Sequence, residues 1–222
     1  MTALLRYQTA LLLRSQGWLP PVLLYVAFVA IGVRAGEPVL GALGYVSAPL
    51  LPVTAWLVRI CLNQEPPAAR SVAAAAAGRT RVHLAAILAG TLGAALPGTV
   101  ALLLVMAAGA RVSADGRTGV PPGPAALAGL LTATVCVLLG AAVGALLTRP
   151  LVPAPGWSFA AIATAALLVL VTTGSPANTA ITGLVDGNLT GRVPLPLLPL
   201  GAAVVLAAAA VALACRLTAV RE

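Results

Sequence analysis

The chain has 222 residues, of which 60% are hydrophobic and only 8% are charged, and its mean hydropathy is +1.04. Soluble domains carry roughly 25% charged residues, so this chain has too few charges to cover a water-facing surface and must have lipid as its main solvent. The net charge of +8 comes from 13 arginines scattered singly between apolar runs, and this scatter argues against a nucleic-acid-binding surface.

The N-terminal residues 2–16 are predicted to form an amphipathic helix on the surface of the inner leaflet. Helical periodicity places most of the apolar side chains on one face and Arg6 and Arg14 on the opposite one, with Gln8 and Leu13 as exceptions. No small-residue cleavage site follows Arg14, so we do not interpret this segment as a signal peptide.

Six apolar stretches follow, at about 18–33, 43–62, 82–110, 125–148, 157–174 and 194–215. Each is near the roughly 20 residues that a helix needs to cross the hydrocarbon core. Long continuous runs favour helices over the short alternating segments of a β-barrel. The sequence therefore predicts one all-α integral membrane domain over 1–222, with a kink at Pro97 and a difficult boundary around Pro49.

The distribution of arginines predicts the orientation, because cytoplasmic loops carry an excess of basic residues. With the N-terminus inside, nine arginines lie on the inner side and four on the outer side, and both termini are then inside. The inner set is Arg6, Arg14, Arg59, Arg70, Arg79, Arg81, Arg149, Arg216 and Arg221, with Glu65 and Glu222; the outer set is Arg34, Arg111, Arg117 and Arg192, with Glu37, Asp115 and Asp186.

The loop 63–81, between the second and third stretches, has the pattern of a short cytoplasmic helix. Glu65 and two prolines suit a helix N-terminus, a run of five alanines favours the helix interior, and Gly78 can end it. We expect about ten helical residues that display Arg70 and are followed by Arg79 and Arg81. Taken alone, the pattern is also compatible with an ordinary cytoplasmic turn under the positive-inside bias.

Two further features concern packing and the outer surface. Gly140 and Gly144 form a small-xxx-small pair in the middle of the fourth stretch, which predicts a close helix contact. The outer segment 175–193 opens with Ser-Pro, which is typical of a helix start, and we expect helical structure there.

This order of parts resembles the membrane (permease) subunit of type-2 ABC exporters, the ABC-2 permease family. The resemblance covers nearly the whole chain: an elbow helix at 2–16, six spans with both ends inside, a coupling helix within 63–81, and an outer helical segment at 175–193. It implies the cytoplasmic membrane of a bacterium. An actinobacterial source would suit a chain that is rich in Ala and has no Lys.

In that family the membrane subunit binds no nucleotide, and this chain has no Lys with which to form a P-loop. The resemblance implies that ATP and Mg are held by a separate ATP-binding cassette subunit, which would contact Glu65, Arg70, Arg79 and Arg81. Lipid phosphates have an equal claim on Arg79 and Arg81. A second copy or a paralogous membrane subunit would complete the pathway, and the cargo would be hydrophobic or amphipathic, such as an antibiotic, peptide or lipid.

Other classes lack the residues that their chemistry needs. An intramembrane protease or a proton-coupled transporter requires ionisable residues at membrane depth, whereas His83 lies at a span boundary and Asp115 and Asp186 lie in outer loops. The three cysteines match no metal-site spacing. A non-transporting membrane anchor or regulatory subunit remains open as the alternative function.

Overall fold

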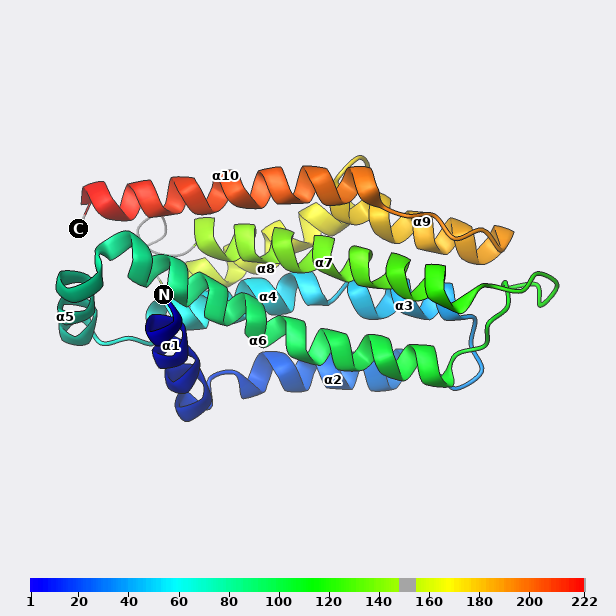
Figure 1. Cartoon of the computed structure of the whole chain (residues 1–222), viewed down its shortest axis with the longest axis horizontal. Coiled ribbons are helices and arrows are strands. Elements are labelled where there is room, and N and C mark those ends of the chain that lie inside the picture. Colours follow the sequence, from blue (N-terminus) through cyan, green and yellow to red (C-terminus); the bar gives the residue numbers. More distant parts are fainter. Residues whose placement is uncertain (148–154, 222) are drawn as a thin grey trace.

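The computed structural model describes residues 1–147 and 155–221. Within these ranges the regular secondary structure is helical, and the long helices run side by side along one axis (Figure 1). The helices are α1 Thr2–Ser15, α2 Leu19–Gly32, α3 Val39–Ser47, α4 Leu50–Asn63, α5 Pro67–Ala77, α6 Arg79–Ala108, α7 Pro122–Leu146, α8 Pro155–Val171, α9 Pro176–Thr190 and α10 Leu197–Arg221.

Among the described residues, four helical segments are long and apolar enough to cross a membrane, and two bent helix pairs raise the number to six if each pair is one crossing. The four are α3 with α4, α6, α7 and α10; the bent pairs are α1 with α2, at 75°, and α8 with α9, at 47°. The all-helical class is thus confirmed, with four to six helical segments that are compatible with a multi-pass membrane protein.

The segment α2 illustrates why the number is a range. Its 14 residues extend about 21 Å, which is short of the roughly 30 Å hydrocarbon core. The chain reaches α2 through Gln16, whose left-handed φ of 53° ends α1.

On α1 the buried residues are Gln8 and Leu12. Gln8 is therefore central to the inward face of α1, although it is an exception to the apolar pattern.

The helix α4 lies at the centre and packs against α6 and α7 through glycines. A Cβ on Gly140 of α7 would overlap the carbonyl oxygen of Leu51, and one on Gly144 would lie 2.7 Å from that of Ala55. On the other side, a Cβ on Gly90 of α6 would lie 2.7 Å from the Cα of Val58. Backbones can come this close only where the side chain is absent.

Prolines divide one predicted span and leave another continuous. The second predicted span is two helices that meet at Pro49, whereas α6 runs as one helix through Pro97. Because proline has no backbone N–H to donate, it destabilises a helix least at the helix start, where the N–H groups have no partner within the helix.

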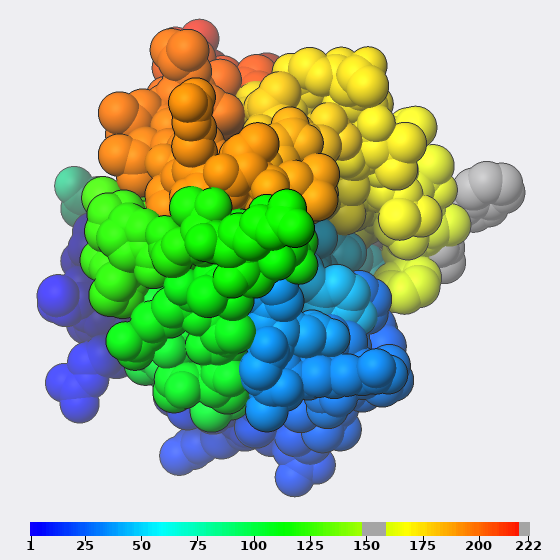
Figure 2. Space-filling model, turned by 90° about the vertical axis from the view of Figure 1, so that its right-hand side faces the viewer, coloured from blue at the N-terminus to red at the C-terminus, as the bar shows by residue number. Residues whose placement is uncertain are grey.

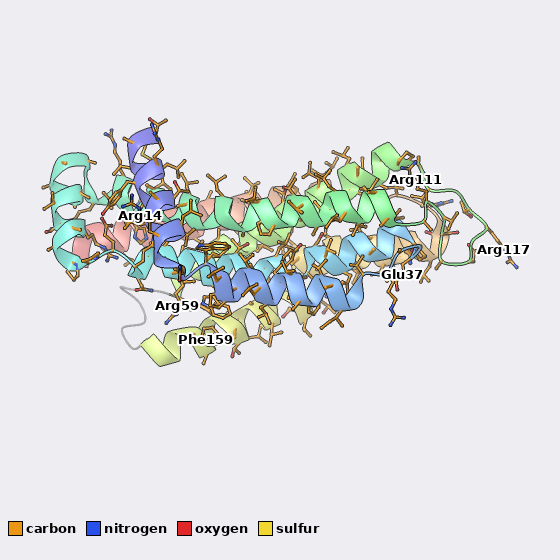
Figure 3. The ribbon with its side chains drawn as sticks, turned by 90° about the horizontal axis from the view of Figure 1, so that it is seen from below. Arg14, Glu37, Arg59, Arg111, Arg117 and Phe159 are labelled. Carbon is orange, nitrogen blue, oxygen red and sulfur yellow. The ribbon has the colours of Figure 1, made fainter. Side chains whose placement is uncertain are left out.

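The two ends of the bundle are formed by different elements. The N-terminus, α1, α5 and the C-terminal end of α10 gather at one end (Figure 1). At the opposite end, the segment 109–121 and α9 extend across the face of the bundle (Figure 2). Arg14 and Arg59 lie toward the first end, and Arg111 and Arg117 lie at the second (Figure 3). Arg149 and Glu222, assigned to the inner side, lie outside the described residues.

Candidate docking site at the α5 end of the bundle

A short helix forms where the pattern in 63–81 predicts one. The 11 residues of α5 extend from Pro67 to Ala77 and are followed by Gly78, whose φ of 89° is a conformation that L-residues rarely adopt. The next helix, α6, begins at once with Arg79. No residue of α5 is buried, and the helix stands beyond the ends of the long helices (Figure 1).

Glu65, just before α5, points inward. Its side chain is only 6% exposed, and its Oε2 accepts a hydrogen bond from Nε2 of Gln8 on α1 at 3.1 Å. Partial burial raises the pKa of the hydroxyl of Tyr7, the residue before Gln8 on α1, and the nearby charge of Glu65 raises it further. The carboxylate therefore joins α1 to the loop that leads into α5.

Arg70 also serves the fold of this end. It is half-buried, and its guanidinium donates a hydrogen bond to the backbone oxygen of Leu62. Leu62 lies in the last turn of α4, where carbonyl oxygens have no partner within the helix. Arg70 therefore caps α4 and holds α5 against it.

Of the four residues predicted to contact a partner, only Arg79 and Arg81 are fully exposed. They lie two residues apart in the first turn of α6, next to the end of α5. The structure thus places two of the predicted residues at the surface and two in the joint between α1, α4 and α5.

The exposed face of α5 also carries an apolar feature. Ala68, Val72 and Ala76 are exposed and lie four residues apart, on one side of the helix. Val72 is 70% exposed. We call these three residues the α5 ridge. In the sequence, this ridge is indicated only by Val72, a single bulky apolar residue that precedes the run of alanines.

A cavity of about 560 Å³ lies between α5, the end of α4 and the start of α6. Its charged and histidine lining residues are Glu65, Arg70, Arg79 and His83. The Oε1 atom of Glu65 is buried and has no hydrogen-bond partner. The cavity is thus a partly open space beneath α5, with both polar and apolar lining.

A second, apolar groove of about 640 Å³ follows α2 and α6 through the bundle. It extends from Leu12 and Trp18 near α1 to Val33 and Ala108 at the far ends of α2 and α6. None of the described residues that line it is charged. Tyr25 lies on its wall, and its hydroxyl donates to the carbonyl oxygen of Val46 at 3.0 Å.

The described residues hold no group of three His, Cys, Asp or Glu side chains that could bind a metal ion. The three cysteines, Cys61, Cys136 and Cys215, are free thiols and are all buried. Comparisons with protein-family models, curated proteins and solved structures found no match to this chain.

Proposed function

We propose that this chain is the membrane-spanning subunit of an ATP-driven exporter, and that a separate ATP-binding subunit docks against α5. The observation that carries the proposal is the placement of α5: a helix without buried residues, beyond the bundle end, with an apolar ridge facing outward. Helices recognised by partner grooves present such anchors at a spacing of four. In this proposal each bent pair contributes one crossing, through α2 and α8, while α1 and α9 lie at the two membrane surfaces, giving six crossings with both termini in the cytoplasm.

The exposed residues supply the contact, and the inward residues hold it in place. Val72 enters a groove of the partner, with Arg79 and Arg81 beside it, while Glu65 and Arg70 fix α5 to α1 and α4. Charge reversal at Glu65 or Arg70 would therefore act on docking through the position of α5. This division of roles refines the expectation that all four charged residues touch the partner.

The connections of α5 give a route for motion. Gly78 joins α5 directly to α6, and Arg70 joins it to the end of α4. Since α4 packs through glycines on α6 and α7, a displacement of α5 reaches packed helices that can shift as units. Closure of the partner on ATP and Mg would supply the displacement.

The apolar groove supports a hydrophobic or amphipathic cargo. It is uncharged along its described lining and extends along most of α2 and the second half of α6. Small-molecule sites are mostly apolar clefts of about 300–1,000 Å³, a range that includes this groove. A second copy, or a paralogous membrane subunit, would close the pathway on its open side.

The test is copurification from native membranes in a mild detergent, with mass spectrometry and an ATPase assay. We expect a stoichiometric ATP-binding subunit with the wild-type chain and at least a roughly tenfold loss of it with Val72→Asp, because a carboxylate in an apolar contact is left unpaired. The control is Val185→Asp on α9, at the opposite end, which should retain the partner.

Two results would contradict the proposal in different ways. Full retention of the partner by Val72→Asp would show that docking does not use the α5 ridge. If the wild-type chain brings down no ATPase while other complexes survive the same detergent, the exporter assignment fails and the anchoring or regulatory function takes its place.

A further inference from the structure

The cavity beneath α5 contains a buried acceptor without a donor. Glu65 is 6% exposed and lines this cavity, and one of its two carboxylate oxygens, Oε2, is bonded to Gln8. The other oxygen, Oε1, is buried without a hydrogen-bond partner. A buried carboxylate oxygen is costly unless it is paired, so this side of the cavity is suited to a cationic hydrogen-bond donor.

The other side of the cavity favours an anion. Arg70 and Arg79 both line it, and α6 begins at Arg79. The first turn of α6 has no side-chain cap and no acidic residue, so its N–H groups and the positive end of the helix dipole add to the two guanidinium groups. One cavity therefore combines an acidic wall with a basic one.

We propose that this cavity binds a zwitterionic amino-phosphate group of the phosphoethanolamine type, with its ammonium on Glu65 and its phosphate at Arg70 and Arg79. A primary ammonium offers three N–H donors, whereas the quaternary ammonium of choline offers none. Only the former can satisfy the buried Oε1 atom. The volume of about 560 Å³ is within the range of small-molecule sites.

The cavity lies under α5, whereas the α5 ridge faces away from the bundle, so ligand and docking partner occupy different surfaces. The inference does not rest on the exporter function and requires no ATPase for its test. Both a membrane lipid with this headgroup and a soluble molecule carrying the same group offer the chemistry.

The test uses the purified full-length chain, stripped of lipid and titrated with dioleoyl phosphatidylethanolamine and its N-methyl, N,N-dimethyl and trimethyl forms, the last being phosphatidylcholine. Native mass spectrometry measures the fraction of protein that retains one lipid. We expect retention to fall with each methyl group and by at least about tenfold across the series, because every methyl removes one N–H donor. Equal retention of the first and last lipids would overturn the proposal.

Variants of the lining residues test which part of the headgroup binds to the acidic side of the cavity and which to the basic side. Glu65→Gln should reduce phosphatidylethanolamine retention to the phosphatidylcholine level and leave phosphatidylcholine unchanged, while Arg79→Ala should weaken both lipids through their shared phosphate. Glu37→Gln, an acidic residue toward the opposite end, is the matched control and should change neither. An unchanged preference in Glu65→Gln would also overturn the proposal. The methyl series on the wild-type chain needs no variant to fold.

A competition experiment distinguishes a membrane lipid from a soluble molecule as the source of the bound group. Soluble glycerophosphoethanolamine at millimolar concentration is added to the phosphatidylethanolamine complex. Displacement shows that the headgroup alone is sufficient and that a soluble amino-phosphate can occupy the site. Retention of the lipid shows that its acyl chains add to binding and that the membrane is the source. Both results support the headgroup chemistry once the methyl series has shown the preference.

Discussion

At the end of the bundle that carries α9, connecting segments are joined by backbone hydrogen bonds, whereas at the α5 end they are joined by side chains. The backbone bonds, at 2.8–3.0 Å, are Gly36 N–H to Ala108 O, Val39 N–H to Ala110 O, Ala110 N–H to Glu37 O and Ala114 N–H to Asn188 O. The α5 end is tied by Gln8 to Glu65 and by Arg70 to Leu62, around a cavity. A side-chain tie can be broken by a change of one rotamer, whereas the backbone bonds break only if the connecting segments themselves move.

This difference indicates at which end of the bundle a displacement of helices can begin. A rigid α9 end and an adjustable α5 end suit a protein that is driven from the α5 side, provided that the helices between them move as units. The glycine contacts of α4 with α6 and α7 supply that stiffness. Three substitutions test the comparison, beginning with the helices that connect the two ends.

The largest effect is expected from Gly140→Ala in α7. The new methyl group would overlap the carbonyl oxygen of Leu51 and lie 2.8 Å from Cβ of Thr54, so α4 and α7 must separate. Overpacking of this kind costs about 1–3 kcal/mol, and we expect the upper part of that range because backbone atoms are the obstacle. The measurement is thermal unfolding in detergent, followed by circular dichroism.

The matched control is Gly201→Ala in α10, where a Cβ would meet nothing within 4 Å. Alanine is a better helix former than glycine, so this change should be neutral or stabilise by up to about 1 kcal/mol. Equal melting temperatures for the two variants would mean that the close approach of α4 and α7 is not a source of stability.

An intermediate effect is expected from Gln8→Leu, which breaks the tie between α1 and the α5 loop. It leaves the Oε2 atom of the buried Glu65 carboxylate without its amide donor, at a cost of about 1–2 kcal/mol. The double variant Gln8→Leu with Glu65→Leu should recover part of that loss, since two apolar residues can replace a buried pair. Denaturant titration of these two variants and of Glu65→Leu alone measures the coupling.

The location of the change is as informative as its size. Hydrogen exchange in Gln8→Leu should increase in α1 and α5 and remain unchanged in the segment 109–121. Faster exchange at both ends would show that the tie stabilises the whole bundle, and the contrast between an adjustable end and a rigid one would then be lost.

The local features of the fold are predictable from the sequence because they depend on neighbouring residues. Hydropathy locates the long helices, and the prolines, alanines and Gly78 locate α5 within a few residues. Ser175 likewise caps α9 as the Ser-Pro start predicts, by accepting a hydrogen bond from the N–H of Asn178. None of these requires knowledge of distant segments.

The joint between α1 and α5 depends on distant residues and could not be predicted in this way. Gln8 and Glu65 are 57 positions apart, and periodicity treated Gln8 as an exception because it recognises only apolar faces. Similarly, the spacing of Gly140 and Gly144 marks a contact, whereas Gly90, between Ala89 and Thr91, belongs to no glycine pair at that spacing. The partner α4 becomes visible only in three dimensions.

The smallest effect is expected at the rigid end, from Asp115→Asn in the segment 109–121. Asp115 accepts hydrogen bonds from the hydroxyl of Ser113 and from the N–H of Arg117, the latter at 3.1 Å. These bonds favour the charged carboxylate and hold the pKa of Asp115 below its ordinary value of 3.8. Hydrogen exchange at the Arg117 amide should therefore be slightly faster in the variant at neutral pH.

The pH dependence gives this prediction its sign. Because the folded pKa is lowered, the stabilising contribution of Asp115 is complete above the unfolded value and is lost as the pH falls through the folded one. Wild-type and variant exchange rates should therefore converge well below pH 3.8. Asp186→Asn on α9 is the control and should leave the Arg117 amide unchanged at every pH. If Asp115→Asn instead loosened α9 as well, the backbone bond between Ala114 and Asn188 would depend on this turn, and the end would be held by side chains after all.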